Sequence, residues 1–148
     1  MQDLNFPPYS FRIKNSQNRQ YIFDGLRKKF VVLQPEEWVR QHVLRYLVFT
    51  KNYPKSLINV EKQLTVNKLK KRYDVVVFHP DGSIFLLIEC KAPEVKITQD
   101  TFDQIARYNY ELKAEYLMVT NGLEHYYCEM DHENEKYTFL KDIPDFSR

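Results

Sequence analysis

The sequence is poor in glycine and cysteine and has no long apolar run, and each shortage excludes a class of protein. Three Gly in 148 residues, without low-complexity tracts, exclude a disordered or fibrous chain. The two cysteines, Cys90 and Cys128, form neither a metal knuckle nor a disulfide framework, so we expect a reducing, cytoplasmic setting. No apolar run reaches the roughly 20 residues of a membrane span, and no signal-peptide pattern begins the sequence. We therefore expect no membrane association.

The sequence does contain many aromatic residues and an uneven distribution of charge. Eleven Tyr and ten Phe supply material for a packed core, and the length suits one domain over residues 1–148. Residues 1–74 hold fifteen Lys or Arg against six Asp or Glu, whereas residues 75–148 hold seven against fourteen. A basic half can attract phosphates, and an acidic half can bind a metal. Alternatively, the two sets of charges interleave on the folded surface.

The first third of the chain predicts a small antiparallel meander followed by a helix. Residues 1–10 predict an irregular arm because they contain Pro7-Pro8 and little β-forming sequence. Turn-forming residues then separate three short β-forming runs, which are Phe11–Lys14, Gln20–Phe23 and Lys29–Leu33. Pro35 suits the first position of a helix, and an apolar stripe predicts that this helix continues to near Thr50.

Apolar runs after this helix predict the strands of a central sheet. The expected strands are Leu57–Leu64, Arg72–His79, Ile84–Lys91, Tyr116–Thr120 and His125–Glu129. The second and third are nearly continuous apolar stretches, which predicts strands covered on both faces. Thr98 can cap a second helix that extends to about Lys113. The last dozen residues fit no single pattern. This order predicts an α/β sandwich around a mixed sheet.

Two acidic residues predict a paired-carboxylate site because they flank one hairpin. Counting outward from the turn at Asp81-Gly82 brings Asp74 and Glu89 to the same end of the paired strands. Glu89 and Lys91 are two residues apart, so their side chains project from the same face. Two neighbouring carboxylates are costly unless a cation lies between them, which predicts bound magnesium, with manganese as an alternative. Lys91 would then stabilise negative charge on a phosphate group.

A basic run leads into Asp74, and its cations predict contacts with nucleic-acid phosphates. The residues concerned are Lys70, Lys71 and Arg72. The alternative is an ordinary solvated run without a ligand. Glu89 and Lys91 also have a simpler interpretation, an exposed ion pair at a strand edge, and only their combination with the other elements favours a site.

The site residues resemble a motif of the PD-(D/E)xK nuclease superfamily. Asp74, Glu89 and Lys91 have the order of its D-x(n)-(D/E)-x-K motif, although Tyr73 stands where the motif's name has Pro. The predicted first helix, with the segment Glu36–Gln41, resembles the acidic helix that precedes the nuclease core. The resemblance implies a restriction-endonuclease-like three-layer sandwich, with a mixed central sheet flanked by helices and an N-terminal β-meander.

Further segments resemble the N-terminal nuclease domain of type I restriction enzyme R subunits, especially its short stand-alone relatives. Gln104 and Tyr108 match the Q-x3-Y element of helicase-associated nucleases. Three further segments resemble that domain in sequence: Arg72–Val77, Ile88–Pro93 and Val119–Gly122. We accordingly divide the chain into an arm and meander (1–34), a catalytic core (35–122) and C-terminal strands with a loop (123–148). The sequence lacks the G-x4-G-K-[ST] pattern of a motor.

The resemblance implies a set of metal ligands. Asp74 and Glu89 would be direct ligands, and the backbone carbonyl of Cys90 would be a third. Glu37 would be the helix carboxylate at the metal, with Glu36 as the alternative.

The resemblance also implies roles for the remaining motif residues. Lys91 would be the catalytic lysine. Gln104 and Tyr108 lie one helical turn apart, and they would orient that lysine or the DNA backbone. Taken alone, the same two residues could be ordinary residues of a helix face.

These inferences predict a magnesium-dependent DNA endonuclease or exonuclease of the restriction or repair type. Its partners would be DNA and either a second copy or a subunit that supplies a motor or specificity. The alternative is a nuclease-like module without catalysis that binds nucleic acid or a partner protein.

Overall fold

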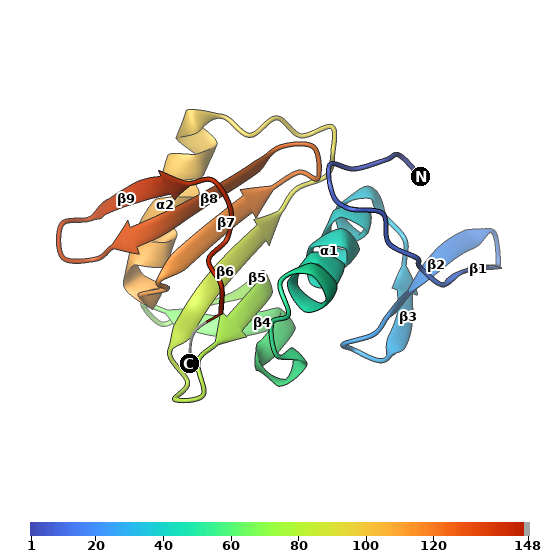
Figure 1. Ribbon diagram of the computed structural model, residues 1–148, viewed down its shortest axis with the longest axis horizontal. Coiled ribbons are helices and arrows are strands. Elements are labelled where there is room, and N and C mark those ends of the chain that lie inside the picture. The colour runs from blue at the N-terminus through green and yellow to red at the C-terminus, as the bar shows by residue number, and fades with distance from the viewer. Residues whose placement is uncertain (147–148) are drawn as a thin grey trace.

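The computed structural model describes residues 1–146, which form two β-sheets and two long helices (Figure 1). Residues 147–148, the end of the expected C-terminal segment, lie outside the described residues. The elements in chain order are β1 (Ile13–Ser16), β2 (Arg19–Asp24), β3 (Lys29–Val32), α1 (Pro35–Arg45), a π-helix (Tyr46–Thr50), a 3-10 turn (Lys55–Leu57), β4 (Ile58–Val66), β5 (Leu69–Phe78), β6 (Ile84–Cys90), α2 (Gln99–Leu112), β7 (Tyr116–Thr120), β8 (His125–Asp131) and β9 (Lys136–Leu140).

The larger sheet is mixed and has a helix on each face, which confirms the expected three-layer sandwich. Its strand order is β4-β5-β6-β7-β8-β9, and within it β6 and β7 run parallel. A parallel pair needs a crossover, and α2 supplies it. Val39 of α1 packs in the same core cluster as Ile88, whereas Ile105 of α2 packs with Leu87 on the opposite face. β1, β2 and β3 form the expected separate meander beside α1 (Figure 1).

The centre of the sandwich lies along β5 and β6, as their apolar sequence predicts. Six side chains here have 0 % of their surface exposed: Val75, Val76, Val77, Leu86, Leu87 and Ile88. Burying a side chain of this size contributes about 1.5–3 kcal/mol, so these two strands fix the position of everything attached to their ends. No helix in residues 1–146 is long and apolar enough to span a membrane.

The local signals placed both helices well. α1 begins at Pro35 with two acidic residues in its first turn, which suits the positive end of a helix dipole. The side chain of Thr98 accepts a hydrogen bond from the backbone N–H of Thr101, so Thr98 caps α2 as expected. Lys113 adopts a left-handed conformation with φ of 56° and ends the helix.

Several boundaries differ from the sequence prediction. β1 is Ile13–Ser16 instead of Phe11–Lys14, and α1 ends at Arg45, after which a π-helix continues to Thr50. β5 begins at Leu69 instead of Arg72, so the basic run forms part of a hairpin arm. Asn67 and Lys68 have φ of 49° and 64°, which allows a two-residue turn that continues the pairing of β4 with β5. The ambiguous C-terminal residues include β9, which pairs antiparallel with β8. Both strands are specified by their partners, because their own apolar pattern is weak.

The N-terminal arm and meander are attached to α1 and to the β7–β8 turn. The backbone N–H of Asn5 donates to the carbonyl of Gly122 at 2.8 Å. Ile22 on the inner face of the meander has 0 % exposure. Asp24 accepts a hydrogen bond from Gln41 of α1 at 2.9 Å. The meander is therefore held by buried polar contacts as well as by apolar packing.

Gly122 is the glycine whose replacement should matter most for stability. It has φ of +87°, and an added Cβ would lie 2.9 Å from Leu4 and 3.1 Å from Val39. We expect Gly122→Ala to lower the free energy of unfolding by about 2 kcal/mol, because strain and overpacking act together. Urea denaturation measures this change. Gly25→Ala is the matched control, since nothing lies within 4 Å of its added Cβ; equal effects of the two substitutions would contradict the prediction.

Candidate functional site

The candidate site lies where β5 separates from β6. The antiparallel pairing of these strands ends at Val75 and Ile88, whereas β6 remains paired with β7 through Cys90 and Thr120. Asp74 is the first residue of β5 beyond this pairing, and its carboxylate accepts a hydrogen bond from the backbone N–H of Cys90 at 2.8 Å. The side chain of Asp74 thus accepts the hydrogen bond that the backbone of β5 no longer accepts from the N–H of Cys90.

Three carboxylates from different elements gather at this separation. Burial, followed by the negative charge of Asp74, raises the pKa of Glu89 to about 7. Burial also raises the pKa of Asp74, although the N–H of Cys90 and the charge of Arg40 oppose the shift. Burial and then the charge of Asp74 raise the pKa of Glu36, which reaches the same place from α1. Closely spaced carboxylates of this kind resist ionising together.

Two lysines approach the carboxylates. Lys91 follows β6 directly, and its positive charge opposes the raised pKa values of Glu36, Asp74 and Glu89. Lys71 of β5 has its Nζ 3.6 Å from Oε1 of Glu89, an ion pair that is too long for a hydrogen bond. The expected grouping of Asp74, Glu89 and Lys91 therefore exists in the fold, with Lys71 in addition.

Glu37 belongs to a different cluster from the one that the resemblance implied. Its carboxylate lies 3.0 Å from Arg27 and 3.3 Å from Arg40, and it also accepts a hydrogen bond from Gln41. Glu36, the alternative, is exposed on the side of α1 that meets Asp74. The helix carboxylate beside the pair of acids is thus Glu36, because the two arginines and Gln41 already engage Glu37.

The arginines connect this cluster to the rest of the site. Arg27 pairs with Asp24 at 2.7 Å and with Glu61 at 3.1 Å. Arg40 lies 3.1 Å from Glu61 and 3.9 Å from Asp74. A single network of ion pairs, which reaches the surface at Glu61, therefore extends from the meander through α1 to the separation of β5 and β6.

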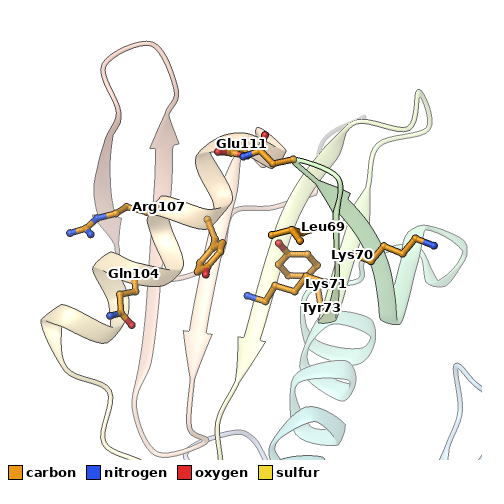
Figure 2. A pocket seen from close by; sticks show the side chains of 9 residues that line it. Leu69, Lys70, Lys71, Tyr73, Gln104, Arg107 and Glu111 are labelled. Atoms are coloured by element: carbon orange, nitrogen blue, oxygen red, sulfur yellow. The ribbon is translucent and has the colours of Figure 1, made fainter.

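Four of the five residues expected to contact nucleic acid or to orient the site line a groove between the β4–β5 hairpin and α2, and Arg72 does not. This groove has a volume of about 760 Å³, and its lining includes Lys70, Lys71, Gln104, Arg107 and Tyr108. Lys71 is directed toward α2, whereas Lys70 extends away from it (Figure 2).

Tyr108 contacts Lys71, which differs from the partner that the resemblance implied. The Nζ of Lys71 lies 4.7 Å from the centre of the Tyr108 ring and 4.9 Å from that of Tyr73. Gln104 lines the same groove. Arg72 is exposed, and its charge acts on Glu61 at the edge of the arginine network.

The donor chemistry of the site fits a hard cation such as magnesium. Three carboxylates supply oxygen atoms, and Oε1 of Glu89 is buried without a hydrogen-bond partner among the described residues. Within residues 1–146, however, no three His, Cys, Asp or Glu side chains are already arranged as a metal cage. The thiol of Cys90 is unsuited to nucleophilic attack, because burial raises its pKa well above the ordinary value.

Sequence patterns missed the contribution of Arg40, and for Lys71 they predicted phosphate contacts but not its ion pair with Glu89. Arg40 follows Glu36 by one helical turn, a spacing that signals neighbouring side chains on α1. Lys71 could be placed only once the hairpin register was known, because that register sets which cations face α2.

The raised pKa of Glu89 predicts a pH-dependent cost to stability. Between the ordinary value of 4.5 and about 7, the folded protein retains a proton that the unfolded chain releases. The stability from this group is therefore full below pH 4.5 and is lost as pH rises toward 7. We expect Glu89→Gln to become more stable than wild type over this range, by about 1–3 kcal/mol at neutral pH without metal.

Urea denaturation of both proteins across this pH range measures the difference. Glu129→Gln, on the exposed side of β8, is the control and should show no such trend. A difference between Glu89→Gln and wild type that stays constant with pH would refute the prediction.

Glu36 and Glu37 should differ in their effect on folding. Glu37→Ala leaves the charges of Arg27 and Arg40 without their shared carboxylate, which should lower the free energy of unfolding by about 3 kcal/mol. Glu36→Ala removes an exposed group with a raised pKa, so we expect a change within about 0.5 kcal/mol. Chemical denaturation compares the two, and equal losses would show that the assignment of the two glutamates is wrong.

Comparison with known proteins confirms the family that the sequence resembles. A search of curated proteins gives no significant match. A family model described as Type I restriction enzyme R protein N terminus matches residues 35–144. The match covers α1, every strand of the larger sheet, α2 and the candidate site between them. This chain therefore belongs to the type I restriction enzyme R protein N-terminal family, and it is a nuclease-like domain.

Proposed function

We propose that the protein is a magnesium-dependent DNA phosphodiesterase of the restriction or repair type. The observation that carries the proposal is the meeting of Glu36, Asp74, Glu89 and Lys91 at the separation of β5 from β6. The family supports a nuclease-related role. Asp74 satisfies the N–H of Cys90, but that contact does not account for the nearby Glu36 and Glu89, whose raised pKa values are typical of a functional site.

The carboxylates of Glu36, Asp74 and Glu89 would hold the metal, with the carbonyl of Cys90 as a further oxygen. Bound magnesium supplies Lewis-acid polarisation of a phosphoryl oxygen and lowers the pKa of bound water. The hydrogen bond from the Cys90 N–H fixes the carboxylate of Asp74, so one ligand is preoriented by the backbone. Manganese fits the same donors.

Lys91 would stabilise the negative charge that develops on the scissile phosphate. Its positive charge lowers the pKa of all three carboxylates, which supports this role. Lys71 would help to neutralise Glu89 and, with Lys70, would contact flanking phosphates along the groove beside α2. Arg72 would contact a phosphate on the side of Glu61. Tyr108 holds Lys71 through its ring face, which is a positioning role.

Cleavage of both strands of a duplex would require two such sites. A second copy of this chain, or a partner subunit that supplies a motor or specificity, would meet that requirement. The second candidate function is a catalytically silent nuclease-like module that binds DNA or a partner protein. The observation that favours it is that the carboxylates are not preformed as a metal cage within residues 1–146.

The proposal predicts metal-dependent cleavage that is lost with the site residues. Plasmid and linear DNA would be incubated with the protein and magnesium or manganese. We expect Glu36→Ala, Asp74→Ala and Lys91→Ala to reduce the cleavage rate by at least about 100-fold, because each removes a ligand or a charge used in the transition state. Glu94→Ala and Lys96→Ala are matched controls, since both residues are exposed and close in sequence.

Calorimetric titration with manganese separates the two candidate functions. A site that binds the ion in wild type and is lost in Asp74→Ala supports a catalytic role. The opposite outcome is a protein that cleaves no DNA and binds no metal, yet still binds DNA in a salt-sensitive way. That outcome would reject the enzyme and favour the catalytically silent module.

A further inference from the structure

The three-stranded sheet has an outer face that no part of the proposed mechanism uses. Its inner face packs on α1, where Ile22 and Asp24 each have 0 % exposure. Strand alternation and the register of β1, β2 and β3 place the other set of side chains on the opposite side. We call this the meander face, and its residues are Arg12, Lys14, Arg19, Tyr21, Phe23, Phe30 and Val32. In Figure 1 no helix or strand of residues 1–146 covers it.

Cationic side chains lie over the aromatic rings of this face. The guanidinium of Arg12 is 4.7 Å from the centre of the Phe23 ring and 5.4 Å from that of Phe30. The ammonium of Lys14 lies 4.3 Å from the Phe30 ring centre and 5.9 Å from that of Tyr21. Both cations are exposed. The face therefore presents aromatic rings with mobile, exposed cations lying over them.

No acidic side chain offsets these cations on the meander itself. Residues 11–33 contain six Lys or Arg and one acidic residue, Asp24. Asp24 points inward, where burial opposes ionisation but hydrogen bonds from Arg27 and Gln41 lower its pKa and keep it ionised. Arg27 lies 2.7 Å from it, so this charge is neutralised inside the protein. The outer charge of the sheet is consequently positive throughout.

Rings and cations on an open sheet are the chemistry that binds a single-stranded nucleic acid. Unpaired bases stack on aromatic side chains, while lysine and arginine neutralise the phosphates between them. A duplex offers its phosphates to such a face but keeps its base faces covered, so the rings discriminate in favour of a single strand.

The meander face is also continuous with the candidate site. A groove of about 480 Å³ runs along the edge of the small sheet. Tyr21 and Phe30 line it together with Glu36, the helix carboxylate of the candidate site. Lys29 lines the same groove and is exposed. A nucleic-acid strand whose bases stack on these rings would therefore extend toward the carboxylates of the candidate site.

We propose that the meander face binds single-stranded DNA and guides it along this groove to the candidate site. The choice of DNA rests on the proposed function, whereas the preference for a single strand rests on the rings and cations alone. Binding here is independent of cleavage, because none of the meander residues is a carboxylate of the site.

The test is a binding measurement with catalysis removed. Full-length Asp74→Ala protein in a chelating buffer would be titrated into a fluorescein-labelled oligothymidylate of about 12 nucleotides, followed by anisotropy. We expect Tyr21→Leu in this background to weaken binding by about tenfold while leaving binding of a matched duplex unchanged. Lys14→Gln should weaken both and reduce the slope of log affinity against log salt by about one.

Lys136→Gln is the control, since Lys136 is exposed on β9 of the other sheet and should change nothing. Lys14→Gln keeps the test decisive if Tyr21→Leu fails to fold. Equal affinity for duplex and single strand, or equal effects of Lys14→Gln and Lys136→Gln, would overturn the proposal. Tighter binding of a matched RNA would overturn the assignment to DNA.

Failure of this proposal can be distinguished from failure of the proposed function. Wild type that cleaves DNA while Tyr21→Leu and Lys14→Gln bind normally would reject only the meander face. Wild type that is inert with every metal, yet binds single strands through Tyr21, would reject the nuclease and retain the binding surface.

Discussion

The hydrogen bond from the backbone N–H of Cys90 to Asp74 marks the point on which the candidate site depends. β6 stays beside β7 here while β5 turns away, so the N–H of a buried residue loses its neighbouring strand. An unsatisfied buried donor is costly, and the carboxylate of Asp74 satisfies it. The same separation admits Glu36 from α1 and leaves Glu89 at the end of a strand whose seven residues are all buried. The central strands thus place acidic groups where their charge is difficult to sustain.

The surrounding polar network offsets only part of that difficulty. Arg40 faces Asp74, and Glu61 and Glu37 in turn hold Arg40 and Arg27. Each arginine therefore shares its charge among several acids, so the carboxylates at the strand ends keep raised pKa values. Retaining such groups at a cost to stability is typical of sites kept for function. The network also connects the meander to α1, which fixes the position of the meander face relative to the carboxylates.

The site lies between two surfaces that use the same pairing of cations with rings. On the side of α2, Lys71 lies against Tyr73 and Tyr108. On the side of α1, the meander sets Lys14 and Arg12 over Phe30 and Phe23. Such pairs keep long side chains extended over a flat surface, which limits the entropy lost when they meet a phosphate. Positive charge therefore lies on both sides of the central sheet, next to the ends of β5 and β6 where the candidate site is located.

The sequence by itself determined the order of the elements, the mixed sheet and the meeting of Asp74 with Glu89. Apolar runs, turn residues and helix caps are local signals, and strand alternation fixes which end of a hairpin two acids share. It could not decide between Glu36 and Glu37, because adjacent residues on a helix point about 100° apart and their surroundings come from distant segments. Arg27 engages Glu37 only after the meander has folded onto α1. The contact of Lys71 with Glu89 and the weakly patterned β9 were likewise decided by tertiary structure, since both depend on pairing between strands.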